Sequence, residues 1–189
     1  KQPDELLDQH AIRNCRVPFR DLRVTNDAQR NNLLIAVENV LKNGPILMGS
    51  HVLDFEKRMA AYCERTDAVG VASGTCALYL ALRSLNIGPG DEVLTSPMSW
   101  VATLNAILMA GARPVFVDVG RDQNINPTLI ESAITKRTRA IVPVHFTGRL
   151  CDMMAISEVA RVHNLLIIED AAQAMGAMRA TYRAGSVGD

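Results

Sequence analysis

The sequence lacks the features that mark several large classes of protein. No run approaches the roughly 20 apolar residues of a membrane-spanning helix, and the polar start Lys1-Gln2-Pro3-Asp4-Glu5 is not that of a signal peptide. Twenty Lys and Arg residues balance twenty Asp and Glu residues, so no basic field favours nucleic acid or an anionic membrane surface. We therefore expect a cytoplasmic protein with neither nucleic acid nor membrane as a partner.

Metal ligand sets and common nucleotide-binding loops are also missing. The four cysteines are scattered without a CxxC pair, and the four histidines show no metal-ligand spacing, so we expect no metal site and no disulfide framework. There is no GxGxxG motif and no lysine of a nucleotide-triphosphate loop. What is abundant is apolar sequence: 48% of the 189 residues are hydrophobic, which predicts a folded domain or the major part of a larger one.

Short β-branched runs alternate with helical segments from Asp67 onward. Strands are expected at 68–72, 92–95, 114–118, 140–144 and 165–168, and helices at 75–85, 100–110, 127–134 and 152–163. Strand, helix, strand at this spacing predicts right-handed crossovers between parallel strands. The expected fold class is therefore α/β, with three layers in which helices cover both faces of a mainly parallel sheet.

The chain is expected to have three parts. Residues 1–26 are polar and unpatterned, and form an N-terminal arm that either lies on another subunit or is a frayed terminus. Residues 27–66 carry two amphipathic helices, expected at 27–43 and 51–64. Residues 67–189 form the sheet domain.

Polar residues follow the last predicted strand, where a ligand of an open α/β sheet binds. Asp170 comes directly after the apolar run and one further carboxylate. A carboxylate that faces a pyridine nitrogen keeps that nitrogen protonated, so the ring can act as an electron sink. Gln173 could donate a hydrogen bond to a phenolic oxygen on such a ring. The plainer alternatives are a turn-forming or helix-capping Asp170 and a polar loop residue at Gln173.

Two further turns are expected at the same edge of the sheet. Ser73-Gly74-Thr75 opens an apolar helix, whose free N–H groups and dipole make an anion site, although a capped helix start is the simpler reading. Trp100 begins the next helix and could stack on a flat ring or instead pack in the core or at a subunit contact. His145 ends another strand and could approach a ligand, but a histidine satisfied by backbone groups is favoured.

Taken together, these motifs resemble the DegT family of sugar aminotransferases, which are pyridoxal 5′-phosphate (PLP) enzymes of fold type I. The resemblance extends from about Val17 to Asp189. The segments that carry it include Ser73-Gly74-Thr75, Gly90-Asp91-Glu92-Val93, Ser99-Trp100-Val101-Ala102-Thr103, 114–118, Glu169-Asp170-Ala171-Ala172-Gln173-Ala174 and Gly185-Ser186-Val187-Gly188-Asp189. Each segment is weak alone, but their order and spacing are specific.

The resemblance implies the large, PLP-binding domain of that fold, and it implies a role for each candidate residue. It assigns Gly74, Thr75 and Cys76 to the cofactor phosphate, Trp100 to the face of the ring, Asp170 to its nitrogen and Gln173 to its phenolic oxygen. Asp170 would be the catalytic residue among them. Family members move an amino group from glutamate or glutamine to a keto sugar, often nucleotide-linked, in amino-sugar or surface-polysaccharide biosynthesis. They work as homodimers with sites built from both subunits.

One part of the family pattern is not in this sequence. The lysine that forms a Schiff base with PLP comes shortly after a pair like Gly188-Asp189, whereas the four lysines here all precede Asp170. We therefore expect the sequence to represent the N-terminal and cofactor-binding portion of an enzyme, without its smaller C-terminal domain. As given, it should bind PLP poorly and should not turn over.

Three other functions stay open. A sugar dehydratase can use the same scaffold with a different residue at the Schiff-base position. A non-catalytic sensor or regulatory protein could retain the fold without the chemistry. A generic nucleotide-binding α/β domain could use the Ser73-Gly74-Thr75 turn and would have affinity for nucleotide but none for PLP.

Overall fold

The computed structural model describes residues 23–44 and 47–189, and the chain divides into two compact units, Lys1–His51 and Val52–Asp189. Most of the predicted N-terminal arm lies outside the described residues. The first unit contains helix α2 (Asp27–Asn43), with the predicted bounds, and Asn26 caps it by accepting a hydrogen bond from the Gln29 N–H at 2.9 Å. No residue of α2 is buried. Within the described ranges, no helix has the length and apolar character needed to cross a membrane.

The prediction of a strand at residues 68–72 is wrong. This segment follows helix α3 (Ser50–Tyr62) and has no regular structure. Its Gly70 N–H donates to Glu56 Oε1 at 2.6 Å rather than to a neighbouring strand. A strand needs a partner for its backbone N–H and C=O groups. None of the described strands pairs with this segment, so its β-branched composition is not sufficient.

The other predicted strands and helices are confirmed, with ends shifted by one or two residues. The strands are β1 (Glu92–Thr95), β2 (Arg113–Phe116), β3 (Thr138–Val142) and β4 (Leu166–Ile167). They form a parallel sheet in the order β2-β1-β3-β4, and a bridge between Val144 and Asp170 extends the last pairing. The helices are α4 (Gly74–Ser84), α5 (Val101–Met109), α6 (Pro127–Ala133) and α7 (Met153–His163).

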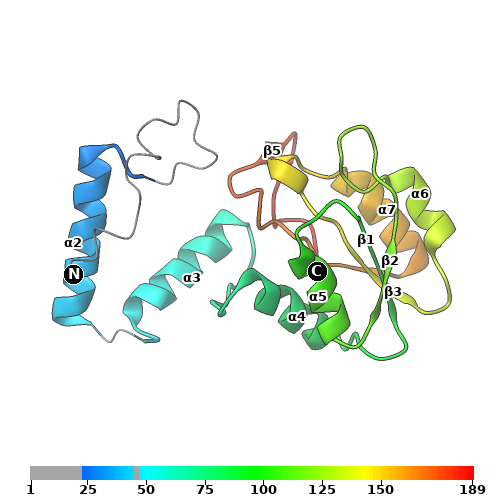
Figure 1. Ribbon diagram of the computed structural model, residues 1–189, viewed down its shortest axis with the longest axis horizontal. Helices are drawn as coiled ribbons and strands as arrows, with labels where there is room; N and C mark the ends of the chain where they lie inside the picture. Colours follow the sequence, from blue (N-terminus) through cyan, green and yellow to red (C-terminus); the bar gives the residue numbers. More distant parts are fainter. Residues whose placement is uncertain (1–22, 45–46) are drawn as a thin grey trace, which may run out of the picture. The chain divides into compact units, whose positions relative to one another are not determined.

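Helices lie on both faces of the sheet (Figure 1), and a hydrophobic layer fills the space on each face. Val93, Ala140 and Val142 pack with apolar residues of α4 and α5. Leu94 and Ile141, the neighbours of these residues in the strands, pack with α6 and α7. Because successive strand residues point to opposite faces, this alternation produces the predicted three-layer α/β architecture.

Polar residues beside the helices fix where these helices begin and end. Side-chain oxygens of Ser73, Asn126 and Asp152 accept hydrogen bonds from N–H groups in the first turns of α4, α6 and α7. Asn164 closes α7 in the left-handed conformation, with φ 55° and ψ 47°. An N-terminal side-chain cap such as that of Ser73, Asn126 or Asp152 stabilises a helix by about 1 kcal/mol.

The last described residues run along β4 after the short hairpin of β5 (Met178–Arg179) and β6 (Tyr182–Arg183). The Asp189 N–H donates to the Ile167 carbonyl at 2.9 Å, and Asp189 Oδ2 accepts the Ile167 N–H at 2.8 Å. A Cβ at Gly188 would lie 2.9 Å from the same carbonyl oxygen, so this close approach requires glycine.

Candidate functional site

The turns that carry the predicted site residues share one edge of the sheet. In a parallel sheet the carboxyl ends of all strands lie at the same edge, and Trp100 follows β1 while Asp170 follows β4. Helices α4 and α5 pack side by side, and each leads into the amino end of a parallel strand (Figure 1). Both helices therefore begin at the carboxyl edge, where α/β sheets bind their ligands.

Asp170 faces the side of the sheet that α4 and α5 cover. Ile168, two residues earlier, packs in the hydrophobic layer of these helices, and alternate residues share a face. The side chain of Asp170 is held by two donors: the Thr103 hydroxyl donates to Oδ2 at 2.5 Å and the Ala172 N–H to Oδ1 at 3.3 Å. Asp170 is only 8% exposed. A carboxylate offers about four acceptor positions, so capacity remains for one more donor.

The start of α4 has unused N–H groups. The Ser73 hydroxyl accepts the Cys76 N–H at 3.1 Å, whereas the N–H groups of Gly74 and Thr75 have no acceptor within the described parts of the chain. A Cβ added at Gly74 would meet nothing within 4 Å, so the backbone beside Gly74 is open. Free N–H groups at the positive end of a helix dipole suit a phosphate.

The Trp100 side chain is 74% exposed, which rules out packing in the core of this chain. It occupies the N-cap position of α5 and makes no capping hydrogen bond. The indole is therefore accessible to a ligand or a partner. One face of a flat heteroaromatic ring is a suitable cover for it.

The side-chain amide of Gln173 is oriented by a single contact. Its Oε1 accepts the Thr147 N–H at 2.9 Å, which leaves the Nε2 donors without a protein acceptor among the residues described. Gln173 is exposed and lies three residues beyond Asp170. Its NH₂ group is therefore available as a donor to an oxygen on a ligand.

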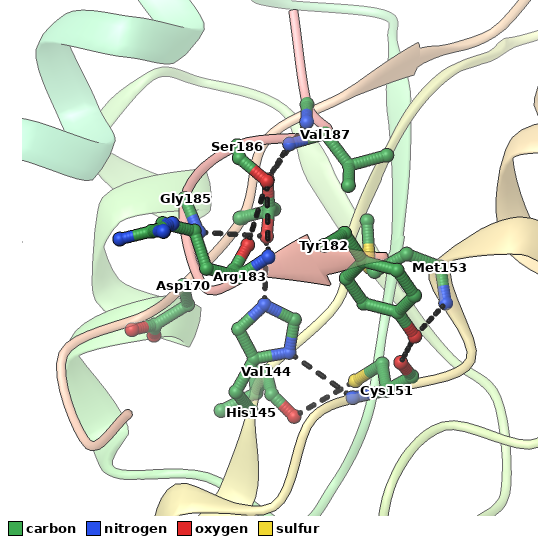
Figure 2. A network of polar contacts seen from close by, with 12 residues as sticks. Val144, His145, Cys151, Met153, Asp170, Tyr182, Arg183, Gly185, Ser186 and Val187 are labelled. Atoms are coloured by element: carbon green, nitrogen blue, oxygen red, sulfur yellow. Dashed lines mark hydrogen bonds and ion pairs between the residues drawn. The ribbon is translucent and has the colours of Figure 1, made fainter. Parts of the chain in front are cut away.

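His145 is fully buried, and its partners are one backbone N–H and one carboxylate, not backbone groups alone as expected (Figure 2). Its Nδ1 accepts the Cys151 N–H at 3.2 Å, so the ring proton is on Nε2, which donates to Glu169 Oε2 at 2.8 Å. Asp170 is turned away from this network in Figure 2. His145 therefore belongs to the opposite side of the sheet from the Asp170 carboxylate.

Glu169 anchors the last described segment of the chain. Besides His145, its carboxylate accepts the N–H groups of Gly185, Val187 and Gly188 at 2.7–3.0 Å. Burial raises the pKa of Glu169, but the hydrogen bonds from His145 and from the three backbone donors outweigh burial and lower this pKa to about 2. Adjacent carboxylates thus have different roles, because Glu169 holds structure and Asp170 faces the open edge.

The fold is that of the large domain of PLP-dependent enzymes of fold type I, with helices on both faces of a parallel sheet. A model of the DegT/DnrJ/EryC1/StrS aminotransferase family matches residues 27–189, and the chain belongs to this family.

Three similar proteins illustrate the relationship. The dTDP-3-amino-3,4,6-trideoxy-alpha-D-glucose transaminase of Streptomyces venezuelae is 47% identical over 92% of this chain and 45% of its own length. A pleiotropic regulatory protein of Geobacillus stearothermophilus is 39% identical over 85% of this chain and 44% of its own. The crystal structure of NtdA from Bacillus subtilis with bound cofactor PMP superposes with a TM-score of 0.81 at 36% identity, covering 85% of this chain and 37% of NtdA. The chain thus spans less than half the length of these relatives.

Two residues near this edge were not predicted as functional from the sequence. Thr103 binds Asp170 from a helix that is distant in the chain, and Glu169 binds a segment that follows it by 16 to 19 residues. The only local signal was the spacing of Ser99 and Thr103, two hydroxyl residues four apart at the start of one helix.

Proposed function

We propose that this chain is the cofactor-binding part of a PLP-dependent sugar aminotransferase. The whole protein would move an amino group from glutamate or glutamine to a nucleotide-linked keto sugar, in amino-sugar or surface-polysaccharide biosynthesis. The observation that carries the proposal is the Asp170 carboxylate, held by Thr103 and Ala172 on the side of the sheet where two helices begin. The similarity to a dTDP-sugar transaminase supports a sugar as the acceptor.

The residues present suit three of the polar groups of PLP: its phosphate, its ring nitrogen and its phenolic oxygen. The N–H groups of Gly74 and Thr75, with the Thr75 hydroxyl, would hold the phosphate, and Cys76 would contribute from the same turn. Asp170 would accept a hydrogen bond from the ring nitrogen, which keeps that nitrogen protonated. PLP would supply an electron sink. Its protonated pyridine ring would accept the electron pair released at the carbon that bears the bound amino group.

Trp100 and Gln173 would fix the plane of the ring. The exposed indole of Trp100 would cover one ring face and exclude water from it. The free NH₂ group of Gln173 would donate to the phenolic oxygen. With the phosphate held at α4, these contacts would orient the ring nitrogen toward Asp170.

The apolar side of α2 supports a homodimer as part of the proposal. Large apolar side chains lie along this side of the helix, and no described residue of its own unit buries them: Leu33, Leu34, Val37 and Leu41. Fully burying one such side chain is worth about 1.5–3 kcal/mol, so covering this face would stabilise an assembly. A second copy of the chain is the proposed cover.

A second candidate is a non-catalytic regulatory protein on the same fold. The similarity to a protein described as a pleiotropic regulator favours it. The retained Asp170 argues against it, because a protein that only senses a ligand has no need for an electron sink. A dehydratase is the remaining enzymatic alternative, since it would use the same carboxylate.

The test is an assay of the full-length protein with PLP, glutamate or glutamine, and keto sugars linked to dTDP, UDP or GDP. We expect a PLP-dependent amino sugar, detected by mass spectrometry, with at least one nucleotide carrier. Loss of a sugar hydroxyl without nitrogen transfer would indicate the dehydratase. A protein that binds no PLP would contradict the proposal.

A further inference from the structure

We propose that Thr103 is a positioning residue for Asp170, and that Ser99, Thr103 and Asp170 form a hydrogen-bond chain with a fixed direction. The proposal rests on the proposed function, because it treats Asp170 as the partner of the PLP ring nitrogen. It adds a role for two hydroxyl groups to which the proposed function assigns no contact with the cofactor.

The direction of the chain follows from the inventory of donors. Thr103 is 2% exposed, and its Oγ1 lies 2.5 Å from Asp170 Oδ2 and 2.7 Å from Ser99 Oγ. A hydroxyl group has one proton to donate, and a carboxylate can only accept. The Thr103 proton therefore points to Asp170, so the Ser99 hydroxyl must be the donor to Thr103.

This arrangement holds the plane of the carboxylate before any ligand arrives. Oδ2 is held by Thr103 and Oδ1 by the Ala172 N–H, so rotation about the Cβ–Cγ bond of Asp170 would break both contacts. Hydrogen bonds to a charged acceptor are roughly twice as strong as neutral ones. A preset acceptor lowers the ordering cost when the ring nitrogen binds, which strengthens binding.

The same chain couples two proposed contacts to PLP. Ser99 directly precedes Trp100, and the Thr103 N–H donates to the Trp100 carbonyl at 3.2 Å in the first turn of α5. The position of the indole is therefore linked to the Asp170 carboxylate through one helical turn. We infer that Thr103 sets the spacing between the residue that stacks on the ring and the residue that binds its nitrogen.

Thr95 provides a matched control for the loss of a buried hydroxyl. It is 1% exposed, and its Oγ1 donates to the Val142 carbonyl at 2.8 Å, within the sheet and not to Asp170. Neither Thr95→Val nor Thr103→Val changes the side-chain shape, but the first removes one buried hydrogen bond and the second removes two, to Asp170 and from Ser99. Only Thr103→Val removes a donor to the proposed cofactor partner.

The experiment uses full-length apoprotein and titrates it with PLP, followed by absorbance, for wild type, Thr103→Val, Thr103→Ser and Thr95→Val. We expect Thr103→Val to raise the Kd for PLP by about ten-fold or more, as for the loss of a hydrogen bond to a charged group. Thr103→Ser keeps the hydroxyl and should restore a Kd close to that of wild type. Thr95→Val should lower the thermal midpoint of the apoprotein as Thr103→Val does, yet leave the Kd unchanged.

A Thr103→Val protein that binds PLP with the Kd of wild type would overturn the proposal. So would a Thr95→Val protein whose Kd for PLP rises as much as that of Thr103→Val. If Thr103→Val does not fold, Ser99→Ala and Thr103→Ser decide: the first should weaken PLP binding a few-fold and the second should not. If Thr103→Ser weakens PLP binding and Ser99→Ala does not, the proposed chain of hydrogen bonds is wrong. Failure of wild type itself to bind PLP would instead reject the proposed function.

Discussion

Glu169 and Asp170 are neighbours in the chain with very different surroundings. Alternation along the extended backbone directs Asp170 to the side of α4 and α5, whereas Glu169 points to His145 and the residues around Gly185. Glu169 accepts four hydrogen bonds and lies in a closed network. Asp170 accepts two and keeps room for a third donor.

Replacement of Glu169 by Gln should destabilise the protein by about 2 kcal/mol at pH 7, because a neutral amide cannot accept all four of these hydrogen bonds. Urea denaturation of the full-length protein would measure the change. Glu158→Gln is the matched control, since this exposed carboxylate pairs with Arg161 on the surface of α7 and with no other residue that the structure describes. It should leave the denaturation midpoint unchanged.

The contribution of Glu169 to the free energy of unfolding should also depend on pH. Its pKa is lowered from 4.5 to about 2 in the folded protein, so its contribution is fully present above pH 4.5 and is lost as the pH falls toward 2. The difference between wild type and Glu169→Gln should therefore narrow between pH 5 and pH 3. A constant difference over this range would mean that the carboxylate charge is not what binds the 185–188 segment.

The sequence predicted those residues of the candidate site whose position follows from the neighbouring strand or helix in the chain. Asp170 and Trp100 each lie in the turn that follows a predicted strand, and Gly74 opens a helix, so the order of elements places all three at one edge of the sheet. Thr103 could not be assigned because its partner is 67 residues away, and the chain gives no local sign of that contact. Glu169 was missed as an anchor for the same reason.

At the scale of elements, helices were easier to predict than strands because each helix makes its own backbone hydrogen bonds. Ser73, Asn126, Asp152 and Asn164 stand at helix ends in the structure, and residues of these types are common helix caps. The segment 68–72 has equally good strand composition but finds no partner among the described strands. Strand formation depends on a neighbour that composition does not reveal.

The start of α4 can be tested with two substitutions that both preserve the helix cap. Ser73→Asp and Ser73→Asn each retain an oxygen that can accept the Cys76 N–H, as Ser73 does. Only Asp places a negative charge where the phosphate of PLP is proposed to bind. We expect Ser73→Asp to raise the Kd for PLP about ten-fold or more, because like charges repel strongly at short distance.

The control for this experiment is pyridoxal, which has no phosphate. Titration of both variants with pyridoxal should give equal Kd values, and both should melt at similar temperatures. If Ser73→Asp raises the Kd for pyridoxal as much as the Kd for PLP, the phosphate is not held at this helix start.

At the scale of the whole molecule, the layer order and the parallel sheet followed from the sequence alone, because alternating strands and helices allow few other arrangements. The division into two compact units differs in position from the domain boundaries expected from the sequence, which remain a prediction. That no described residue of its own unit covers the apolar side of α2 was visible only in the structure, since an amphipathic pattern does not say what covers the apolar side.

The proposed dimer predicts that charge on the apolar stripe of α2 will separate the subunits. Leu34 and Leu41 are 61% and 69% exposed and lie two turns apart on one face. The double substitution Leu34→Asp and Leu41→Asp should shift full-length protein from dimer to monomer in sedimentation analysis. Substitution of Asn31 and Asn32 by Asp in the same helix adds equal charge and should leave the dimer intact. Equal behaviour of the two variants would exclude the stripe as the dimer contact.

Amino transfer by full-length Asp170→Asn protein tests the central claim most directly. The matched control is Asp91→Asn, because Asp91 holds the Gly88 N–H at the opposite edge of the sheet, before β1. If Asp170 keeps the PLP ring nitrogen protonated, Asp170→Asn should fold normally yet lose amino transfer by about 100-fold or more, while Asp91→Asn retains wild-type turnover. Turnover by Asp170→Asn equal to that of wild type would contradict the account.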